Sequence, residues 1–244
     1  KDMFDIHGGG LDLRFPHHEN EMAQTRAAGY DSAARWMHSA WVTAKGEKMS
    51  KSLGNGLSVP AVLAENSAWV VRYALGSVQY RSMLEWSDQT LTEAQSAYDR
   101  VSNFIERAGA AVGGQPSREE IVSVSADELP ADFVAAMNDD INVSGASAAI
   151  FTAIRSGNTL LSKLADRVDS DVAKDEVRAV LVNVRAMLDT LGLDPLAEPW
   201  VSEGAAGCAA GAGADSAEHT ALDRLVSEQL EERTEARKAK DFAR

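Results

Sequence analysis

The sequence predicts two architectures in succession, an α/β segment at the start of the chain and an all-α helical bundle after it. A short apolar stretch near the start runs into three consecutive glycines and then into a helical pattern, which is typical of α/β folds. From about residue 90 onward, apolar residues recur only at helical spacing. A Gly- and Ala-rich stretch at 203–214 has almost no side chain to pack, which indicates a flexible linker.

The α/β segment is predicted to contain two strands and two or three helices. Residues 3–7 form the first strand, the glycines at 8–10 form a loop, and a proline opens a helix over 16–28. Residues 36–43 are rich in aromatic and β-branched side chains, which favours a second strand. Apolar spacing over 59–76 predicts one or two further helices.

Residues 90–193 are predicted to form an antiparallel helical bundle. Segments 132–137 and 145–165 have helical patterns, and two more helices carry apolar residues three or four positions apart, which places them on one face. These two apolar faces comprise Ala94, Tyr98, Val101, Ile105 and Ala108, and Val177, Leu181, Val184, Leu188 and Leu191.

Composition and charge exclude several functions. Hydrophobic residues make up 45% of the 244 positions, and no apolar run approaches the roughly 18 residues that a membrane span needs, so a soluble protein without a membrane partner is expected. The net charge of -13 argues against a protein that coats nucleic acid indiscriminately, although residues 233–244 hold a local basic cluster. The single cysteine, Cys208, excludes an intrachain disulfide framework and favours a reducing, cytoplasmic location.

The first candidate site is the pentapeptide His-His-Glu-Asn-Glu at residues 17–21. On a helix, His17 and Glu21 are four positions apart with Cβ atoms about 5–6 Å from each other, as two ligands of one metal ion would be. His18 and Glu21, three positions apart, could do the same. A solvated helix start, where acidic side chains suit the helix dipole, explains the pattern equally well.

The second candidate site surrounds the three glycines. Gly9 would let the backbone approach a ligand closely, and Asp12 could accept a hydrogen bond from a sugar hydroxyl or an amine. The same residues form a tight turn as often as a binding site. His7, at the end of the predicted strand, could equally be a half-buried structural histidine.

The strongest signal is the pentapeptide Lys48-Met49-Ser50-Lys51-Ser52, which a glycine follows at position 54. Two lysines and two serines on such a loop can surround a triphosphate and neutralise the charge that grows on the α-phosphate and on departing pyrophosphate. A solvated basic loop is the alternative, but a five-residue match of this kind rarely arises by chance.

These motifs resemble a known family. The lysine pentapeptide resembles the second signature of the class I aminoacyl-tRNA synthetases, and FDIHGGGLDLRFPHHENE together with GEKMSKSLGN resembles the cysteinyl-tRNA synthetase family in particular. Further along, FVAAMNDDIN at 133–142 resembles the start of a helix in that family's bundle domain, and RKAKDFA at 237–243 resembles the start of its anticodon-recognition domain.

The resemblance implies a fold class and four segments. The fold is an α/β Rossmann-like half-domain followed by an all-α helical bundle. The expected segments are the second half of a class I catalytic domain at 1–89, the bundle domain at 90–200, a Gly/Ala-rich linker at 201–215, and the beginning of an anticodon-recognition domain at 216–244.

The resemblance also implies a reaction, in which L-cysteine is activated with ATP to a cysteinyl-adenylate and then transferred to the tRNA for cysteine. A zinc ion would bind the substrate thiol, held by His17 and Glu21, because a soft metal separates a thiolate from the hydroxyl of serine. Lys48 and Lys51 would stabilise the transition state, with Mg²⁺ accompanying ATP. The residues expected to contact ATP or the adenylate are Lys51, Lys48, Met49, Ser50, Ser52, His7, Gly9 and Asp12.

The family's first signature, His-Ile-Gly-His, is not in the sequence, and Cys208 matches neither of the two cysteines that complete the family's zinc site. The chain is therefore expected to be a fragment from the carboxyl-terminal side of such an enzyme, inactive alone and derived from a monomeric parent.

Two other functions compete with this one. A mycothiol-pathway cysteine ligase also activates cysteine with ATP but transfers it to an amino sugar; Glu21 and the basic helix at 222–244 favour the tRNA enzyme. A non-catalytic RNA-binding protein derived from a synthetase would need neither the lysine loop nor the pair of His17 and Glu21.

Overall fold

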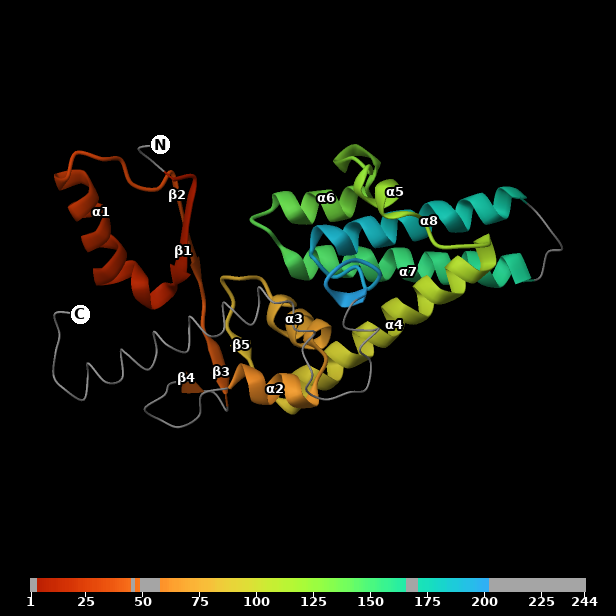
Figure 1. Cartoon of the computed structure of the whole chain (residues 1–244), viewed down its shortest axis with the longest axis horizontal. Coiled ribbons are helices and arrows are strands. Elements are labelled where there is room, and N and C mark those ends of the chain that lie inside the picture. Colours follow the sequence, from red (N-terminus) through yellow and green to blue (C-terminus); the bar gives the residue numbers. More distant parts are fainter. Residues whose placement is uncertain (1–3, 45–46, 49–57, 166–170, 202–244) are drawn as a thin grey trace, which may run out of the picture. The chain divides into compact units, whose positions relative to one another are not determined.

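The computed structural model of the chain describes residues 4–44, 47–48, 58–165 and 171–201, all within one compact unit, Lys1–Ala205 (Figure 1). Among these residues, no helix is both long and apolar enough for a bilayer span. The predicted segment at 216–244 and nearly all of the predicted linker lie outside the described residues. In chain order the elements are β1 (Ile6–Gly10), η1 (Leu11–Leu13), η2 (Arg14–His18), α1 (Glu19–Ala27), β2 (Arg35–Ser39), β3 (Val42–Ala44), β4 (Glu47–Lys48), α2 (Val59–Glu65), α3 (Ala68–Gly76), β5 (Leu84–Glu85), α4 (Asp88–Val112), α5 (Arg118–Val122), η4 (Ala126–Glu128), α6 (Ala131–Asn138), α7 (Val143–Ala165) and α8 (Asp171–Thr190).

The strands form two small sheets. β1 and β2 pair in parallel, and the chain crosses between them through α1, as parallel strands require (Figure 1). In the second sheet β3 lies in the middle, pairing antiparallel with β4 and parallel with β5. Parallel strands joined through a helix, followed by helices alone, confirm the predicted fold class.

The structure corrects the predicted glycine loop. The three glycines are the last residues of β1, where they pair with Met37, His38 and Ser39 of β2. A Cβ atom built on Gly9 would lie 2.7 Å from Cε1 of His18, so only glycine leaves room for this imidazole against the strand.

The strand predicted at 36–43 is two strands in different sheets. β2 ends at Ser39 and β3 begins at Val42, because the N–H of Ala40 donates to the carbonyl of Tyr80 (2.7 Å) rather than to a neighbouring strand. The predicted first helix also begins later than Pro16, at Glu19, after the helical turn of η2, where Phe15 has an extended backbone.

The segment 59–76 forms two helices. Asn66 has an extended backbone after α2, and the Ser67 hydroxyl caps α3 by accepting a hydrogen bond from the N–H of Val70 (3.3 Å). α3 buries Trp69, whose indole N–H donates to the carbonyl of Leu193 (2.8 Å). The apolar core is therefore continuous from α3 into the bundle.

The helical bundle has the predicted faces. Val101 and Ile105 of α4 are buried in one core with Val177 and Leu181 of α8, and α7 lies beside α8 (Figure 1). Two short helices, α5 and η4, were not predicted from the sequence and occupy the connection between α4 and α6.

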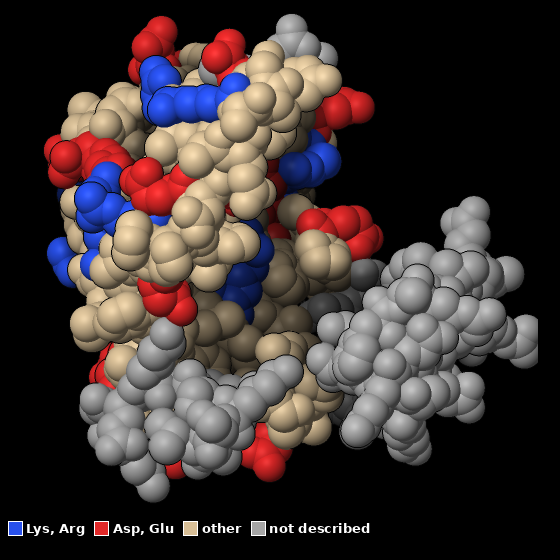
Figure 2. Space-filling view, turned by 90° about the vertical axis from the view of Figure 1, so that its left-hand side faces the viewer, with Lys and Arg blue, Asp and Glu red and all other residues tan. Residues whose placement is uncertain are grey.

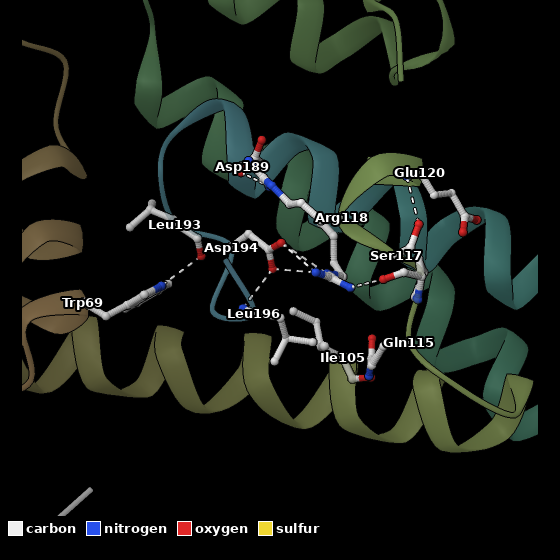
Figure 3. A network of polar contacts seen from close by, with 12 residues as sticks. Trp69, Ile105, Gln115, Ser117, Arg118, Glu120, Asp189, Leu193, Asp194 and Leu196 are labelled. Atoms are coloured by element: carbon white, nitrogen blue, oxygen red, sulfur yellow. Dashed lines mark hydrogen bonds and ion pairs between the residues drawn. The ribbon is translucent and has the colours of Figure 1, made fainter. Parts of the chain in front are cut away.

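A buried ion pair joins α8 to the segment that follows it. The side chains of Arg185 and Asp194 are 3% and 0% exposed. Nε of Arg185 lies 3.2 Å from both carboxylate oxygens of Asp194, and Nη2 lies 2.9 Å from one of them. Asp194 also accepts from the N–H of Leu196 (Figure 3), and Nη1 of Arg185 donates to the carbonyl of Pro116. Each buried charge thus has its partners, as a stable buried pair requires.

Candidate functional site

Two histidines and a glutamate converge beside the β1–β2 sheet. His7 belongs to β1, His18 ends η2, and Glu21 lies in the first turn of α1. One ligand atom from each lies within 4.8 Å of the others, and Nδ1 of His7 is 3.5 Å from Oε1 of Glu21. The side chains of His7 and Glu21 are 23% and 35% exposed, so this group is open to a small ligand.

His18 is the buried member of the group. It is 4% exposed, and its Nδ1 lies 2.9 Å from Nε2 of His38, so one ring nitrogen donates and the other accepts. Burial lowers the pKa of the His18 imidazole, the charges of His7, His38 and His17 lower it further, and Glu21 opposes them. The neutral ring that these effects favour is the form that binds metal ions.

Trp36 holds two of the histidine rings. It stacks on His7 with ring centroids 4.6 Å apart, and its centroid lies 5.0 Å from that of His18. In the strand register Trp36 is opposite His7, and His38 is opposite Gly9. Trp36 and His38 were missed as site residues, although their spacing of two in a predicted strand places them on one face.

The predicted metal pair lies on the outer side of this group. Nε2 of His17 is 3.9 Å from Oε2 of Glu21, and the His17 side chain is 65% exposed. The two oxygens of Glu21 thus face different histidines, one toward His7 and the other toward His17. Imidazole nitrogens and a carboxylate are ligands that zinc accepts, so the chemistry of these side chains fits this metal.

Two of the predicted adenylate contacts, Gly9 and Asp12, lie at the carboxyl end of β1, the edge at which parallel sheets bind ligands. The Ser39 hydroxyl donates to the carbonyl of Gly9 (3.4 Å). Asp12 of η1 accepts a hydrogen bond from the indole N–H of Trp41 (3.3 Å), and its carboxylate lies over Gly10, where a Cβ atom would be 2.5 Å from Oδ1. This edge therefore offers the Asp12 carboxylate beside the half-buried backbone of Gly9 and Gly10.

The predicted lysine loop begins at β4. The backbone of Lys48 pairs with Thr43 of β3. Only the backbone of Lys48 is described. Met49, Ser50, Lys51 and Ser52 lie outside the described residues.

The matching family models define the class of protein. Residues 1–96 match the tRNA synthetases class I (C) catalytic domain, and residues 132–195 match the DALR domain. The methionyl-tRNA synthetase of Mycobacterium tuberculosis in complex with methionyl-adenylate has a similar fold, with a TM-score of 0.53 at 20% identity, over 79% of this chain and 40% of that one. The chain belongs to the class I tRNA synthetases.

Curated relatives define the family within that class. The cysteine–tRNA ligase of Bifidobacterium longum (strain NCC 2705) is 82% identical over 243 residues, which are 100% of this chain and 44% of the relative. The cysteine–tRNA ligase of Beutenbergia cavernae is 51% identical over 245 residues, 100% of this chain and 48% of the relative. The chain belongs to the cysteinyl-tRNA synthetase family, and it spans about half the length of the curated relatives it matches.

On the face in Figure 2, basic and acidic side chains are interspersed and do not form one continuous basic surface.

Proposed function

We propose that this chain supplies the second half of the catalytic domain and the helical body of a cysteine–tRNA ligase. The whole enzyme would activate L-cysteine with ATP to cysteinyl-adenylate and transfer it to the tRNA for cysteine. The observation that carries the proposal is the pair of His17 and Glu21, which lies beside His7 and His18 at a parallel sheet, in a chain 82% identical to a ligase of that name.

His17 and Glu21 would hold the zinc ion, whose chemistry is to bind the substrate thiol as a thiolate and so to discriminate against serine. His7 would orient the Glu21 carboxylate, because its ring lies against one carboxylate oxygen and is itself stacked on Trp36. His18 would keep the start of α1 against β1, since Gly9 leaves the space for its ring.

The remaining predicted residues would act on ATP. Lys48 and Lys51 would neutralise charge that grows on the phosphates, with Met49, Ser50 and Ser52 shaping the same loop. At the carboxyl edge of β1, Gly9 and Asp12 would contact the adenylate or its amino acid. Mg²⁺ would accompany the ATP.

The experiment that tests this function uses a full-length ligase that contains this chain. Residues 1–244 replace the aligned 44% of the Bifidobacterium longum ligase, and the chimaera is assayed for zinc content and cysteine-dependent pyrophosphate exchange. Substitution Glu21→Gln should weaken zinc affinity by about tenfold or more, and raise the KM for cysteine far more than the KM for ATP.

The matched control is Glu19→Gln, which removes an exposed acid from the same helical turn and should change neither quantity. Unchanged zinc content and unchanged cysteine KM in Glu21→Gln would reduce Glu21 to a surface acid and remove the proposed metal site. A chimaera without cysteine-dependent exchange would contradict the proposed function as a whole.

A further inference from the structure

The corner between α6 and α7 has a locally unfavourable backbone. Asp140 and Ile141 have φ values of 52° and 55°, in the left-handed region that a β-branched residue such as Ile141 rarely adopts. Two successive non-glycine residues with positive φ persist only where surrounding contacts compensate for the backbone strain.

Contacts from the turn before β5 do compensate. The Asp140 carboxylate accepts from the hydroxyl of Tyr80 (2.7 Å) and from Nε of Arg81 (2.6 Å). Nε2 of Gln79 lies 3.3 Å from the Asp140 carbonyl and 3.4 Å from its carboxylate. Nearby, the Ser144 hydroxyl donates to the carbonyl of Ser77 (3.0 Å). One aspartate of the bundle thus binds three consecutive residues of the turn.

The other side of the same turn holds the junction of the two sheets. The carbonyl of Tyr80 accepts from the N–H of Ala40 (2.7 Å), between β2 and β3. Beyond the turn, the N–H of Leu84 donates to the carbonyl of Trp41 (3.0 Å), which begins the pairing of β5 with β3. β2 carries Trp36 and His38, which contact His7 and His18 of the candidate site, while β3 pairs with β4, where the predicted lysine loop begins.

We propose that Asp140 is a positioning residue for cysteine activation, because it fixes the 79–81 turn and thereby the junction between β2, which contacts His7 and His18, and β3. This inference rests on the proposed function. The carboxylate touches no reacting atom; it acts through Tyr80 and Arg81 on Ala40. Loss of the carboxylate leaves the two sheets intact and disturbs their alignment with each other.

The test uses the full-length chimaera and the variant Asp140→Gly. Glycine adopts positive φ without strain, so this change removes the carboxylate while relieving the backbone, and a loss of activity then cannot arise from a strained corner. The kcat of cysteine-dependent pyrophosphate exchange should fall about tenfold or more, as for catalytic groups displaced from alignment, while the KM values for ATP and cysteine stay within about twofold.

Three companion variants separate positioning from general damage. Asp140→Asn keeps an acceptor and should recover much of the kcat, whereas Asp139→Ala, beside it in the same corner, should match the parent within about twofold. Arg81→Ala should also lower kcat. The double variant with Asp140→Gly should lower kcat by a factor smaller than the product of the two single-variant factors.

Amide hydrogen exchange gives a readout independent of activity. Asp140→Gly should speed exchange at the amide of Ala40 while protection within α7 and α8 is retained. Unchanged kcat in Asp140→Gly, or unchanged protection at Ala40, overturns the inference. A parent chimaera with no pyrophosphate exchange would contradict the proposed function, and protection at Ala40 would still decide whether Asp140 controls the junction.

Discussion

Removal of the Asp194 carboxylate should be among the most destabilising single changes in the bundle. Asp194 is completely buried and is bonded to Arg185, whose side chain is 3% exposed. The change Asp194→Ala would leave the guanidinium buried with the carbonyl of Pro116 as its remaining hydrogen-bond partner among the described residues. Breaking a buried pair from one side costs about 3–5 kcal/mol, because the other charge stays uncompensated.

The structure contains a matched control for this effect. Arg118 of α5 pairs with Asp189 of α8, but these side chains are 51% and 24% exposed (Figure 3). Solvent screens such a pair, so Arg118→Ala should cost about 0–1 kcal/mol. Each pair joins an arginine to an aspartate, and one member of each lies on α8. The expected losses in free energy of unfolding differ because only the pair of Arg185 and Asp194 is buried.

The assay is urea unfolding of the 244-residue chain, followed by helical circular dichroism at neutral pH. A loss of about 3–5 kcal/mol is a large part of the roughly 5–15 kcal/mol that stabilises a domain, so the midpoint should move strongly or folding should fail. The double variant Asp194→Ala, Arg185→Met removes the stranded charge and should regain part of the loss. The reasoning is refuted if Asp194→Ala stays within about 1 kcal/mol of the parent, or if Arg118→Ala costs as much.

Three further predictions follow from other parts of the chain. A Cβ atom on Gly157 would lie 2.5 Å from the ring of Phe104, so Gly157→Ala should destabilise the bundle by about 1–3 kcal/mol in urea unfolding despite alanine's better helix propensity. Hydrogen bonds from Tyr80 and Arg81 lower the pKa of Asp140. The stability that the Asp140 carboxylate contributes is therefore present above the ordinary aspartate pKa and is lost as pH falls through the lowered value. Asp140→Asn should flatten the acid side of a curve of unfolding free energy against pH. In the full-length chimaera, Lys51→Ala should lower pyrophosphate exchange by roughly 10²–10³, whereas Lys163→Ala on α7 should leave it within about twofold.

The helices of the bundle were predictable because their burial is periodic along the chain. Val101 and Ile105, or Val177 and Leu181, lie four positions apart, and each pair is buried. The missed helices also had a local signal. Ser117 and Ser125 are each followed three positions later by a glutamate, the pattern of a capping box, and each serine stands at the start of its element.

The errors in the α/β segment have a different origin. Glycine has low intrinsic strand propensity, so no local rule predicts that Gly9 belongs to a strand; the ring of His18 against it is a tertiary contact. The break near Ala40 depends on Tyr80, forty positions further along, and no periodicity within 36–43 encodes that partner.

The candidate site shows the same division. The sequence indicated that Glu21 could pair with a histidine three or four positions before it, and both His17 and His18 lie near its carboxylate. The sequence could not show that His18 is buried, because that depends on Trp36 and His38 being brought beside it by the pairing of β2 with β1.

The residues that break local rules support the same strand from two sides. Gly9 is unfavourable in a strand, yet it makes space for His18, which hydrogen-bonds His38 near the end of β2. Asp140 has a positive φ, which is uncommon for a residue other than glycine, yet its carboxylate binds Tyr80. The Tyr80 carbonyl in turn accepts a hydrogen bond from the N–H of Ala40, two positions after His38. One anchor comes from β1 and the other from the bundle, so the end of β2 is fixed with respect to both. Loss of either anchor should therefore leave the other intact, with Gly9→Ala disturbing the histidine group and Asp140→Gly disturbing the path to the lysine loop.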